Sequence, residues 1–302
     1  MIIAPDYYKE FKCVAEKCRH NCCIGWEIDV DPVTLCKYEK FSGELGEKLR
    51  RNIVVEGGVA SFKTGDDDRC PFLSSRGLCE IIISQGEGAL CQVCADHPRW
   101  RNFFSDHTEI GVGASCEEAA RLILSKNHKV GYEVIDDSEE AEKLSDFERF
   151  ILKNRAYILG VLQNREQKIA ERITKIREEL SLPNPADFSL RAEFLLNLER
   201  LDDQWDEVLL RAKQGKKSRE IDVIFAEQIA VYFIMRHLGN AEDDFDFIDR
   251  QSFCLFATEL VISLYERTDF GIEELFRLFS SEIEYSDDNL FSCIEAAGEG
   301  RL

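Results

Sequence analysis

The chain has 302 residues, of which 44% are hydrophobic, and its formal net charge is −20. This length suggests one large or two ordinary domains, and the apolar content allows a substantial core. The net charge repels nucleic-acid phosphates and anionic membranes, so we expect no nucleic-acid partner; it favours basic partners such as lysine-bearing proteins, although it also serves plain solubility.

The first residues carry no targeting signal. Met1 to Cys13 lack the basic segment and apolar run of a signal peptide. No stretch approaches the roughly 18 apolar residues of a membrane-spanning helix. We therefore expect a cytoplasmic protein without a transmembrane segment, whose thiols are kept reduced rather than paired in disulfides.

Residues 1–132 predict an irregular, cysteine-rich domain with a few short strands. Residues 26–31 and 53–55 alternate like strands, and the β-branched run 78–83 indicates another. Glycine, aspartate and cysteine interrupt these runs.

Two helices are expected within this part of the chain. One covers 32–41, with Asp31 as its N-cap and Pro32 at its first position. The other covers 115–125 and has acidic residues in its first turn, where they favour the helix dipole.

Residues 133–302 predict a helical domain, introduced by an acidic and polar linker at 133–145. Periodic apolar residues indicate helices at 169–180, 187–213, 220–238, 252–265 and 272–279. The fold class expected for the whole chain is therefore mainly α, with an irregular metal-binding domain followed by a helical one.

The twelve cysteines are concentrated in the first part of the chain, since ten lie between Cys13 and Cys116. Cys254 and Cys293 stand alone among apolar residues and are expected to be buried packing residues. Soft thiolates at the density of the other ten select zinc or an iron–sulfur cluster. The spacing alone does not distinguish iron–sulfur from one or two structural zinc sites with four cysteines each.

The ten cysteines include four candidate ligand groups. These are Cys13-x4-Cys18-x3-Cys22-Cys23, the pair Cys70 and Cys79, Cys91-x2-Cys94, and Cys116. Cys22 and Cys23 are neighbours whose side chains point apart, so they cannot easily serve one tetrahedral ion. Cys116 precedes a predicted helix, whose N-terminus would stabilise its thiolate.

Other chemistry has little support in the sequence. His20 and His97 lie among the cysteines and could be ligands, but an ordinary loop position is the favoured reading of both. The sequence has no P-loop, no GxGxxG after a strand, no HExxH and no GxSxG. The CxxxCxxC motif of radical S-adenosylmethionine enzymes is also absent, because Gly25 stands three residues after Cys22, where that motif needs a cysteine.

Several motifs in residues 1–125 together resemble the flagellin lysine-N-methylase family, and the part from Cys18 to Pro98 resembles the broader group of zinc- or iron-chelating cysteine-cluster domains. The matching segments are Pro5-Asp6-Tyr7-Tyr8, Phe11-Lys12-Cys13, Cys18-x3-Cys22-Cys23-x-Gly25-Trp26-x-Ile28, Cys70-Pro71-Phe72-Leu73, Leu78-Cys79, Gly86-Glu87, Cys94-x3-Pro98-Arg99 and Ser115-Cys116-x-Glu118-Ala119-Ala120-Arg121-Leu122.

The resemblance implies methyl transfer from S-adenosylmethionine to lysine side chains of flagellin, or of another lysine-bearing protein, with a 4Fe–4S cluster that is needed for activity. The metal ligands that it implies are Cys13, Cys18, Cys22, Cys23, Cys70, Cys79, Cys94 and Cys116. Cys91 ranks below these eight, and Cys36, inside a predicted helix, ranks last.

The resemblance does not assign catalytic residues or an S-adenosylmethionine site. The sequence has no glycine-rich cofactor loop, so an iron of the cluster could help to hold that cofactor. The alternative function is a non-catalytic module that binds zinc or iron.

Overall fold

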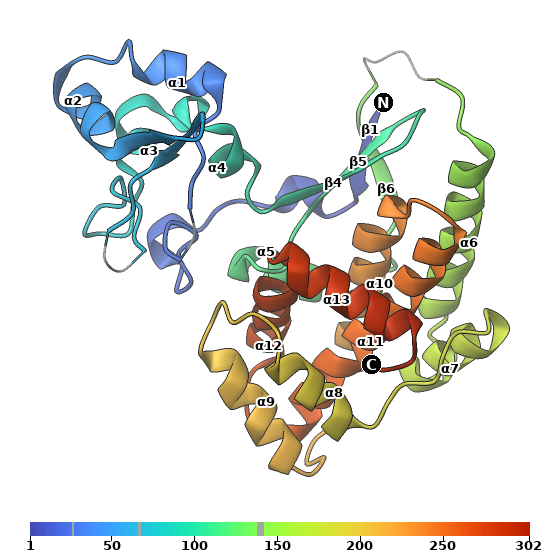
Figure 1. Cartoon of the computed structure of the whole chain (residues 1–302). Coiled ribbons are helices and arrows are strands. Elements are labelled where there is room, and N and C mark those ends of the chain that lie inside the picture. The colour runs from blue at the N-terminus through green and yellow to red at the C-terminus, as the bar shows by residue number, and fades with distance from the viewer. Residues whose placement is uncertain (26, 66–67, 138–141) are drawn as a thin grey trace. The chain divides into compact units, whose positions relative to one another are not determined.

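The computed structural model describes the chain from residue 1 to 302 except for residues 26, 66–67 and 138–141. The described chain is mainly helical with a few short strands, as the sequence predicted (Figure 1). Its internal contacts divide it into two units. We call Lys12–Pro98 the cysteine-rich unit, and Met1–Phe11 together with Arg99–Leu302 the helical unit.

This division differs from the expected boundary between residues 132 and 133. Residues 99–132 belong to the helical unit because their apolar side chains are part of its core, among them Trp100, Val112 and Leu122. The first eleven residues join the same unit through a strand.

A four-stranded sheet lies in the helical unit, in the order β4-β5-β1-β6. Its strands are β1 (Ile2–Pro5), β4 (Arg99–Phe103), β5 (Thr108–Val112) and β6 (Tyr132–Asp136). β1 runs parallel to β5 and antiparallel to β6. The prediction of a linker from residue 133 was therefore wrong at its start, because Val134 pairs with Ile3.

Nine α-helices are described in the helical unit. They are α5 (Glu117–Leu124), α6 (Asp146–Leu162), α7 (Ile169–Glu179), α8 (Phe188–Leu196), α9 (Gln204–Gln214), α10 (Val223–His237), α11 (Asp244–Arg267), α12 (Ile272–Phe279) and α13 (Asp287–Gly298). The single helix expected at 187–213 is two helices, since α8 ends at Leu196. The helix expected at 252–265 is the C-terminal part of α11.

The core of the helical unit surrounds α10 and α11, which are buried over most of their length. Phe233 on α10 packs edge-on against Phe276 and Phe279 of α12, with ring centroids 5.8 and 5.2 Å apart. Cys254 and Cys293 lie in this core, as expected for packing residues.

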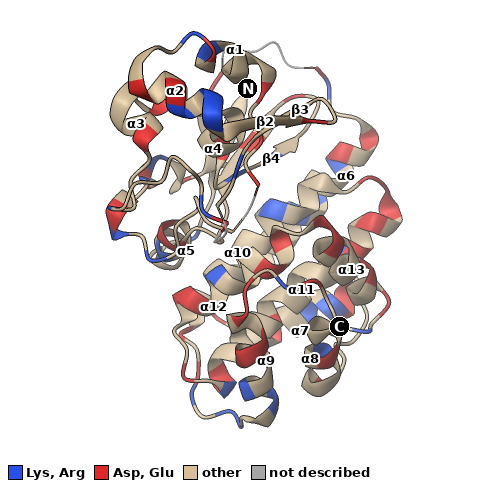
Figure 2. Cartoon of the chain, turned by 60° about the vertical axis from the view of Figure 1, so that its left-hand side comes forward, with Lys and Arg blue, Asp and Glu red and all other residues tan. Residues whose placement is uncertain are grey.

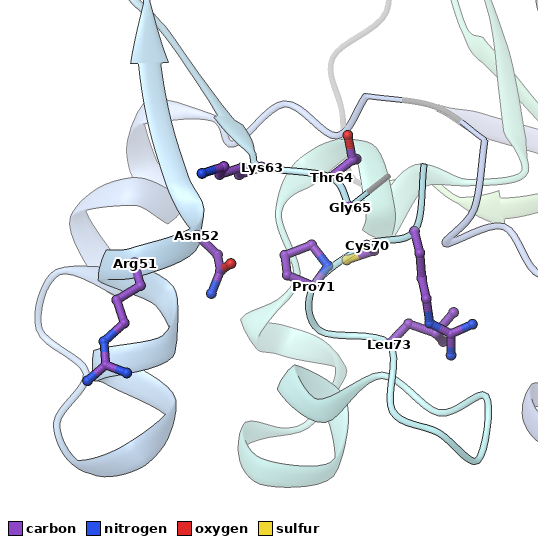
Figure 3. A pocket seen from close by; sticks show the side chains of 9 residues that line it. Arg51, Asn52, Lys63, Thr64, Gly65, Cys70, Pro71 and Leu73 are labelled. Atoms are coloured by element: carbon purple, nitrogen blue, oxygen red, sulfur yellow. The ribbon is translucent and has the colours of Figure 1, made fainter. Parts of the chain in front are cut away.

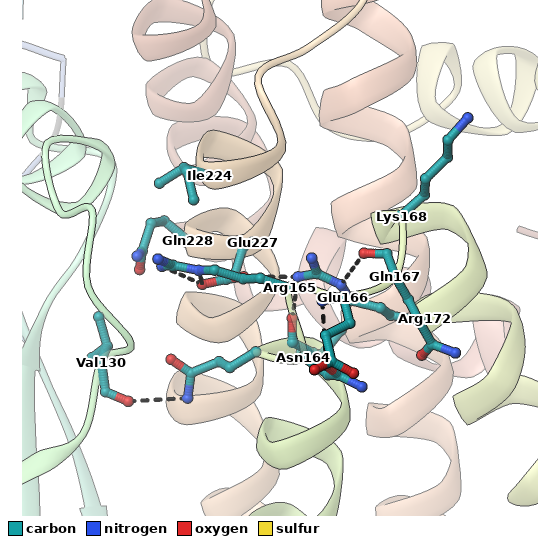
Figure 4. Close-up of polar contacts among 12 residues, drawn as sticks. Val130, Asn164, Arg165, Glu166, Gln167, Lys168, Arg172, Ile224, Glu227 and Gln228 are labelled. Carbon is teal, nitrogen blue, oxygen red and sulfur yellow. Dashed lines mark hydrogen bonds and ion pairs between the residues drawn. The ribbon is translucent and has the colours of Figure 1, made fainter.

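A buried carboxylate fastens α10 to the segments beside it (Figure 4). Glu227 is fully buried and pairs with Arg165 and Arg172, each through a 2.7 Å contact. Arg172 also donates to the Leu162 carbonyl at 2.7 Å. A buried charge is tolerated only when it is paired in this way, so the network has a structural role.

The cysteine-rich unit contains short elements joined by turns. They are α1 (Pro32–Tyr38), α2 (Gly43–Asn52), β2 (Ile53–Glu56), β3 (Val59–Phe62), α3 (Glu80–Gln85) and α4 (Gln92–Asp96). Gly57 and Gly58 form the β2–β3 turn with φ of +57° and +89°, a geometry that favours glycine. Asp31 is the N-cap of α1, as predicted, and accepts from the Thr34 N–H at 2.9 Å.

The strand expected at 78–83 is wrong, because residues from Glu80 onward form α3. Only an isolated bridge between Leu73 and Cys79 precedes this helix. Ile81 is buried whereas Ile83 is exposed, so only one face of this helix packs against the core. In the expected strand 26–31, residue 26 lies outside the described residues and Asp29 makes one bridge to Ser61.

Acidic and basic side chains are interspersed along the helices of both units (Figure 2). In the part of the chain that the structure describes, no helix has the length and apolar character needed to cross a membrane.

Candidate cysteine centre

Six thiols of the cysteine-rich unit interact with one another electrostatically. They are Cys22, Cys23, Cys70, Cys79, Cys91 and Cys94, which we call the six-thiol group. Cys23 is influenced by the charges of Cys70 and Cys79, and Cys94 by those of Cys91, Cys23 and Cys70. Cys70 and Cys91 are buried in one core, and Cys23, Cys79 and Cys94 pack against it, so the three sequence pairs meet in one region.

Asn21 joins the first pair to a distant segment. Its Oδ1 accepts from the Cys23 N–H at 2.9 Å, and its Nδ2 donates to the Gly77 carbonyl at 3.3 Å. The Cys70 N–H donates to the Cys23 carbonyl at 2.8 Å. These hydrogen bonds bring the Cys22–Cys23 turn beside the Cys70 turn.

Cys70 begins a tight turn (Figure 3), and backbone N–H groups of this turn point towards the Cys70 sulfur. Burial raises the pKa of the Cys70 thiol to about 11, while the N–H groups of Phe72 and Leu73 donate to Sγ and oppose that rise. Donors placed in this way stabilise a thiolate, which is the form that binds a metal.

Cys79 precedes the first residue of α3 and has a similar environment. Burial raises its pKa, whereas the N–H groups of Ile82 and Ile81 at the start of the helix donate to its sulfur and lower it. The sulfur atoms of Cys70 and Cys79 therefore both accept hydrogen bonds from backbone N–H groups. These bonds lower the pKa of each thiol by less than burial raises it.

Cys91 and Cys94 are hydrogen-bonded to each other at the start of α4. The Cys94 thiol donates to Cys91, which lowers the pKa of Cys91 and raises that of Cys94. The Cys94 N–H also donates to the Cys91 sulfur. In this pair, as in Cys22 and Cys23, the pKa of one thiol is lowered and that of the other is raised.

Aromatic residues of the unit's core border this group. The rings of Phe62 and Phe72 lie 4.8 Å apart, and Tyr38 stacks on Phe62 at 6.2 Å. Cys70 and Cys91 are buried in the same core, at 5% and 0% exposure. Cys70 and Cys91 thus occupy core positions, and Cys23, Cys79 and Cys94 pack against this core, whereas Cys22 is exposed.

Three of the predicted ligands have other surroundings. Cys13 is exposed, and its sulfur accepts from the Ala15 N–H at 3.4 Å. Cys18 donates to the His20 carbonyl at 3.2 Å. Cys116 belongs to the helical unit, where it directly precedes α5.

Among the described residues, no three His, Cys, Asp or Glu side chains are placed to hold one metal ion. Charge interactions act over several ångströms, whereas a zinc–sulfur bond is about 2.3 Å long, so the thiols are gathered without being in coordinating positions. The donor set itself fits zinc or an iron–sulfur cluster, because it consists of soft sulfur ligands with backbone N–H donors. It does not distinguish between these two.

Cys91, which ranked below the eight predicted ligands, is buried in the core of the unit, and Cys94 packs against the same core. The two form a CxxC pair, a spacing that commonly binds one metal. Cys36, ranked last, is exposed on α1.

The chain is similar to three curated proteins over part of its length. It is 23% identical over 130 residues to the lysine-N-methylases of Salmonella typhimurium and Salmonella choleraesuis, which covers 41% of this chain and 32% of each of those proteins. It is 20% identical over 162 residues to the flagellar biosynthetic protein FliU of Salmonella muenchen, covering 52% of this chain and 94% of that protein. The chain thus spans about a third of the length of the two lysine-N-methylases. No family model and no solved structure matches it.

Proposed function

We propose that this chain is a protein lysine N-methyltransferase that uses S-adenosylmethionine and a cysteine-held iron–sulfur cluster, with flagellin or another lysine-bearing protein as its substrate. The observation that carries the proposal is the six-thiol group in a chain similar to a lysine-N-methylase. Flagellin is the favoured substrate because a further relative is named as a flagellar biosynthetic protein.

The cysteine-rich unit would hold the cluster through members of the six-thiol group. Cys70 and Cys79 are the strongest candidates, since backbone N–H groups already donate to their sulfurs. Cys91 and Cys22 carry the lowered pKa within their pairs and would be next. A bound 4Fe–4S cluster supplies an iron at which S-adenosylmethionine can be held.

The reaction moves one methyl group. The bond between the sulfonium sulfur and the methyl carbon breaks, a bond to lysine Nζ forms, and the thioether keeps the electron pair of the broken bond. The lysine must first lose a proton to solvent, so the rate should climb with pH towards the lysine pKa of about 10.4. The net charge of −20 attracts lysine-bearing proteins, an effect that weakens as salt rises.

A second candidate is a non-catalytic module that binds zinc or iron. The specific observation in its favour is that Cys70 and Cys91 are buried in the core of a small unit, as structural metal ligands often are.

Methyl incorporation into flagellin, measured by mass spectrometry, separates the two. Anaerobically purified protein and the same protein stripped of metal are compared, each with S-adenosylmethionine. The proposal expects lysine methylation with the first sample only. Methylation by both would refute the role of the cluster, and methylation by neither would favour the non-catalytic module.

A further inference from the structure

A hollow of the helical unit lies between the C-terminal end of α8 and the segment that contains α13. Its volume is about 320 Å³, at the lower end of the usual range for ligand sites of roughly 300–1,000 Å³. All of its lining residues belong to the stretch 142–302, which the structure describes without a gap. They are Phe194, Asn197, Leu198, Ser292, Glu295 and Arg301. The lining thus combines one carboxylate, one guanidinium and two large apolar side chains.

Hydrogen bonds hold the two walls of this hollow together. Near the start of α13, Asn289 donates to the Glu199 carbonyl and accepts from the Glu199 N–H, each at 3.0 Å. After α13, the Arg301 N–H donates to the Ala296 carbonyl at 2.8 Å. The Arg301 guanidinium lies over the ring of Phe194, with its Cζ 5.5 Å from the ring centroid. The hollow is therefore fixed by contacts between its two walls.

The Glu295 carboxylate is available to a ligand. Among the residues that the structure describes, its side chain makes no hydrogen bond and no ion pair. Burial, together with neighbouring carboxylates that include Glu295, raises the pKa of Asp249 on α11. The surroundings of Glu295 are thus acidic, and this end of the hollow favours a cation.

Arg301 supplies the opposite charge. Its Nε contacts Glu299 at 2.5 Å, but the two side chains are 49% and 54% exposed, so water screens this pair. Within the described chain, its two terminal nitrogens have no hydrogen-bond partner, and no ion pair joins Arg301 to Glu295. A guanidinium with both terminal nitrogens open can hold a carboxylate through two parallel hydrogen bonds.

We propose that this hollow binds a small ligand through its α-amino-acid group. The ligand ammonium would pair with Glu295, its carboxylate with Arg301, and its apolar part would lie against Phe194 and Leu198. A ligand with only one of the two charges would leave the other charged side chain unpaired. The site uses none of the cysteines, so the inference holds whether or not the chain transfers methyl groups.

Isothermal titration of the intact, metal-loaded chain with L-leucine tests this inference. L-leucine should bind, whereas isocaproate, which lacks the ammonium, and isoamylamine, which lacks the carboxylate, should each bind about tenfold more weakly, the effect of losing a charged hydrogen bond. Glu295→Gln should weaken L-leucine by a similar factor and leave isocaproate unchanged. Arg301→Gln should weaken L-leucine and leave isoamylamine unchanged.

The matched control is Glu179→Gln, which removes one exposed carboxylate at the end of α7, outside the hollow. It should leave the affinity for L-leucine nearly unchanged, and urea unfolding of each variant identifies a folding defect separately. S-adenosylmethionine carries the same α-amino-acid group, so it is titrated as a second arm: competition with L-leucine would identify it as the occupant, and independent binding would identify a free amino acid.

Two results would overturn the inference, whatever the methylation assay shows. One is that neither L-leucine nor S-adenosylmethionine binds in a manner that depends on Glu295. The other is that Glu179→Gln weakens L-leucine as much as Glu295→Gln does.

Discussion

The Cys23 thiol donates a hydrogen bond to the sulfur of Cys22, and this donation lowers the pKa of Cys22 to about 7 even though burial acts to raise it. The same bond raises the pKa of Cys23. The expectation that these two neighbouring side chains point apart was therefore wrong, because their sulfur atoms meet in the turn. Two adjacent cysteines therefore differ in character: one is half ionised near neutral pH, and the other keeps its proton. A metal would bind the ionised sulfur first, because the thiolate is the ligand form.

The first prediction concerns the reactivity of Cys22. In metal-stripped protein, its alkylation rate should rise with pH and reach half its maximum near pH 7, because only the thiolate reacts. In Cys23→Ala the donor is lost, so the midpoint should move up towards the ordinary thiol value of about 8.5. The measurement is peptide mass spectrometry after timed exposure to iodoacetamide. An identical midpoint in the variant would show that Cys23 does not tune its neighbour.

A second prediction concerns acid stability. Burial alone would raise the pKa of Glu109, but hydrogen bonds from His107 and Arg155 hold it at about 2. Its value in the unfolded chain is about 4.3, so the folded state gains stability from this group above that pH and loses it as pH falls towards about 2. Glu109→Gln should be less stable than the natural chain at neutral pH, and the difference should shrink through this window. Urea unfolding at several pH values measures it; a difference that stays constant would contradict the assignment.

The third prediction concerns the buried network of α10. Glu227→Gln leaves Arg165 and Arg172 without their counter-charge, and removing one partner of a buried pair costs about 3–5 kcal/mol. Glu193→Gln is the control, since Glu193 is exposed and its contact to Lys213 is 3.7 Å long, so the loss should stay below about 1 kcal/mol. Chemical denaturation gives both values. Similar losses in the two variants would mean that the network does not stabilise the unit.

The sequence predicted the helices in which periodic apolar residues form a face that packs against the core. Residues 272–279 were expected as a helix and form α12 with the same bounds, because one apolar face meets the core. The sheet could not be predicted in the same way. Its strands are only four or five residues long, and Ile2 pairs with both Thr108 and Asp136, which are distant in sequence.

The sequence could predict the kind of site, but not which of the thiols lie close together. Thiol density in a chain expected to be cytoplasmic predicted a soft-metal site. Which thiols meet depends on contacts between distant segments, such as the Asn21 amide with the Gly77 carbonyl. Cys91 is a second example. Its neighbour Cys94 was a predicted ligand, but the interaction of Cys91 with Cys70 and Cys79 becomes evident only in the folded unit.

The most direct test of the account is the iron and acid-labile sulfide content of the chain, purified without oxygen. The natural chain should contain both, Cys79→Ala should lose most of each and destabilise the cysteine-rich unit, and Cys254→Ala should keep both with a packing loss of roughly 1–2 kcal/mol. Stoichiometric zinc without sulfide, or equal loss of metal in Cys254→Ala and Cys79→Ala, would contradict an iron–sulfur centre held by the six-thiol group.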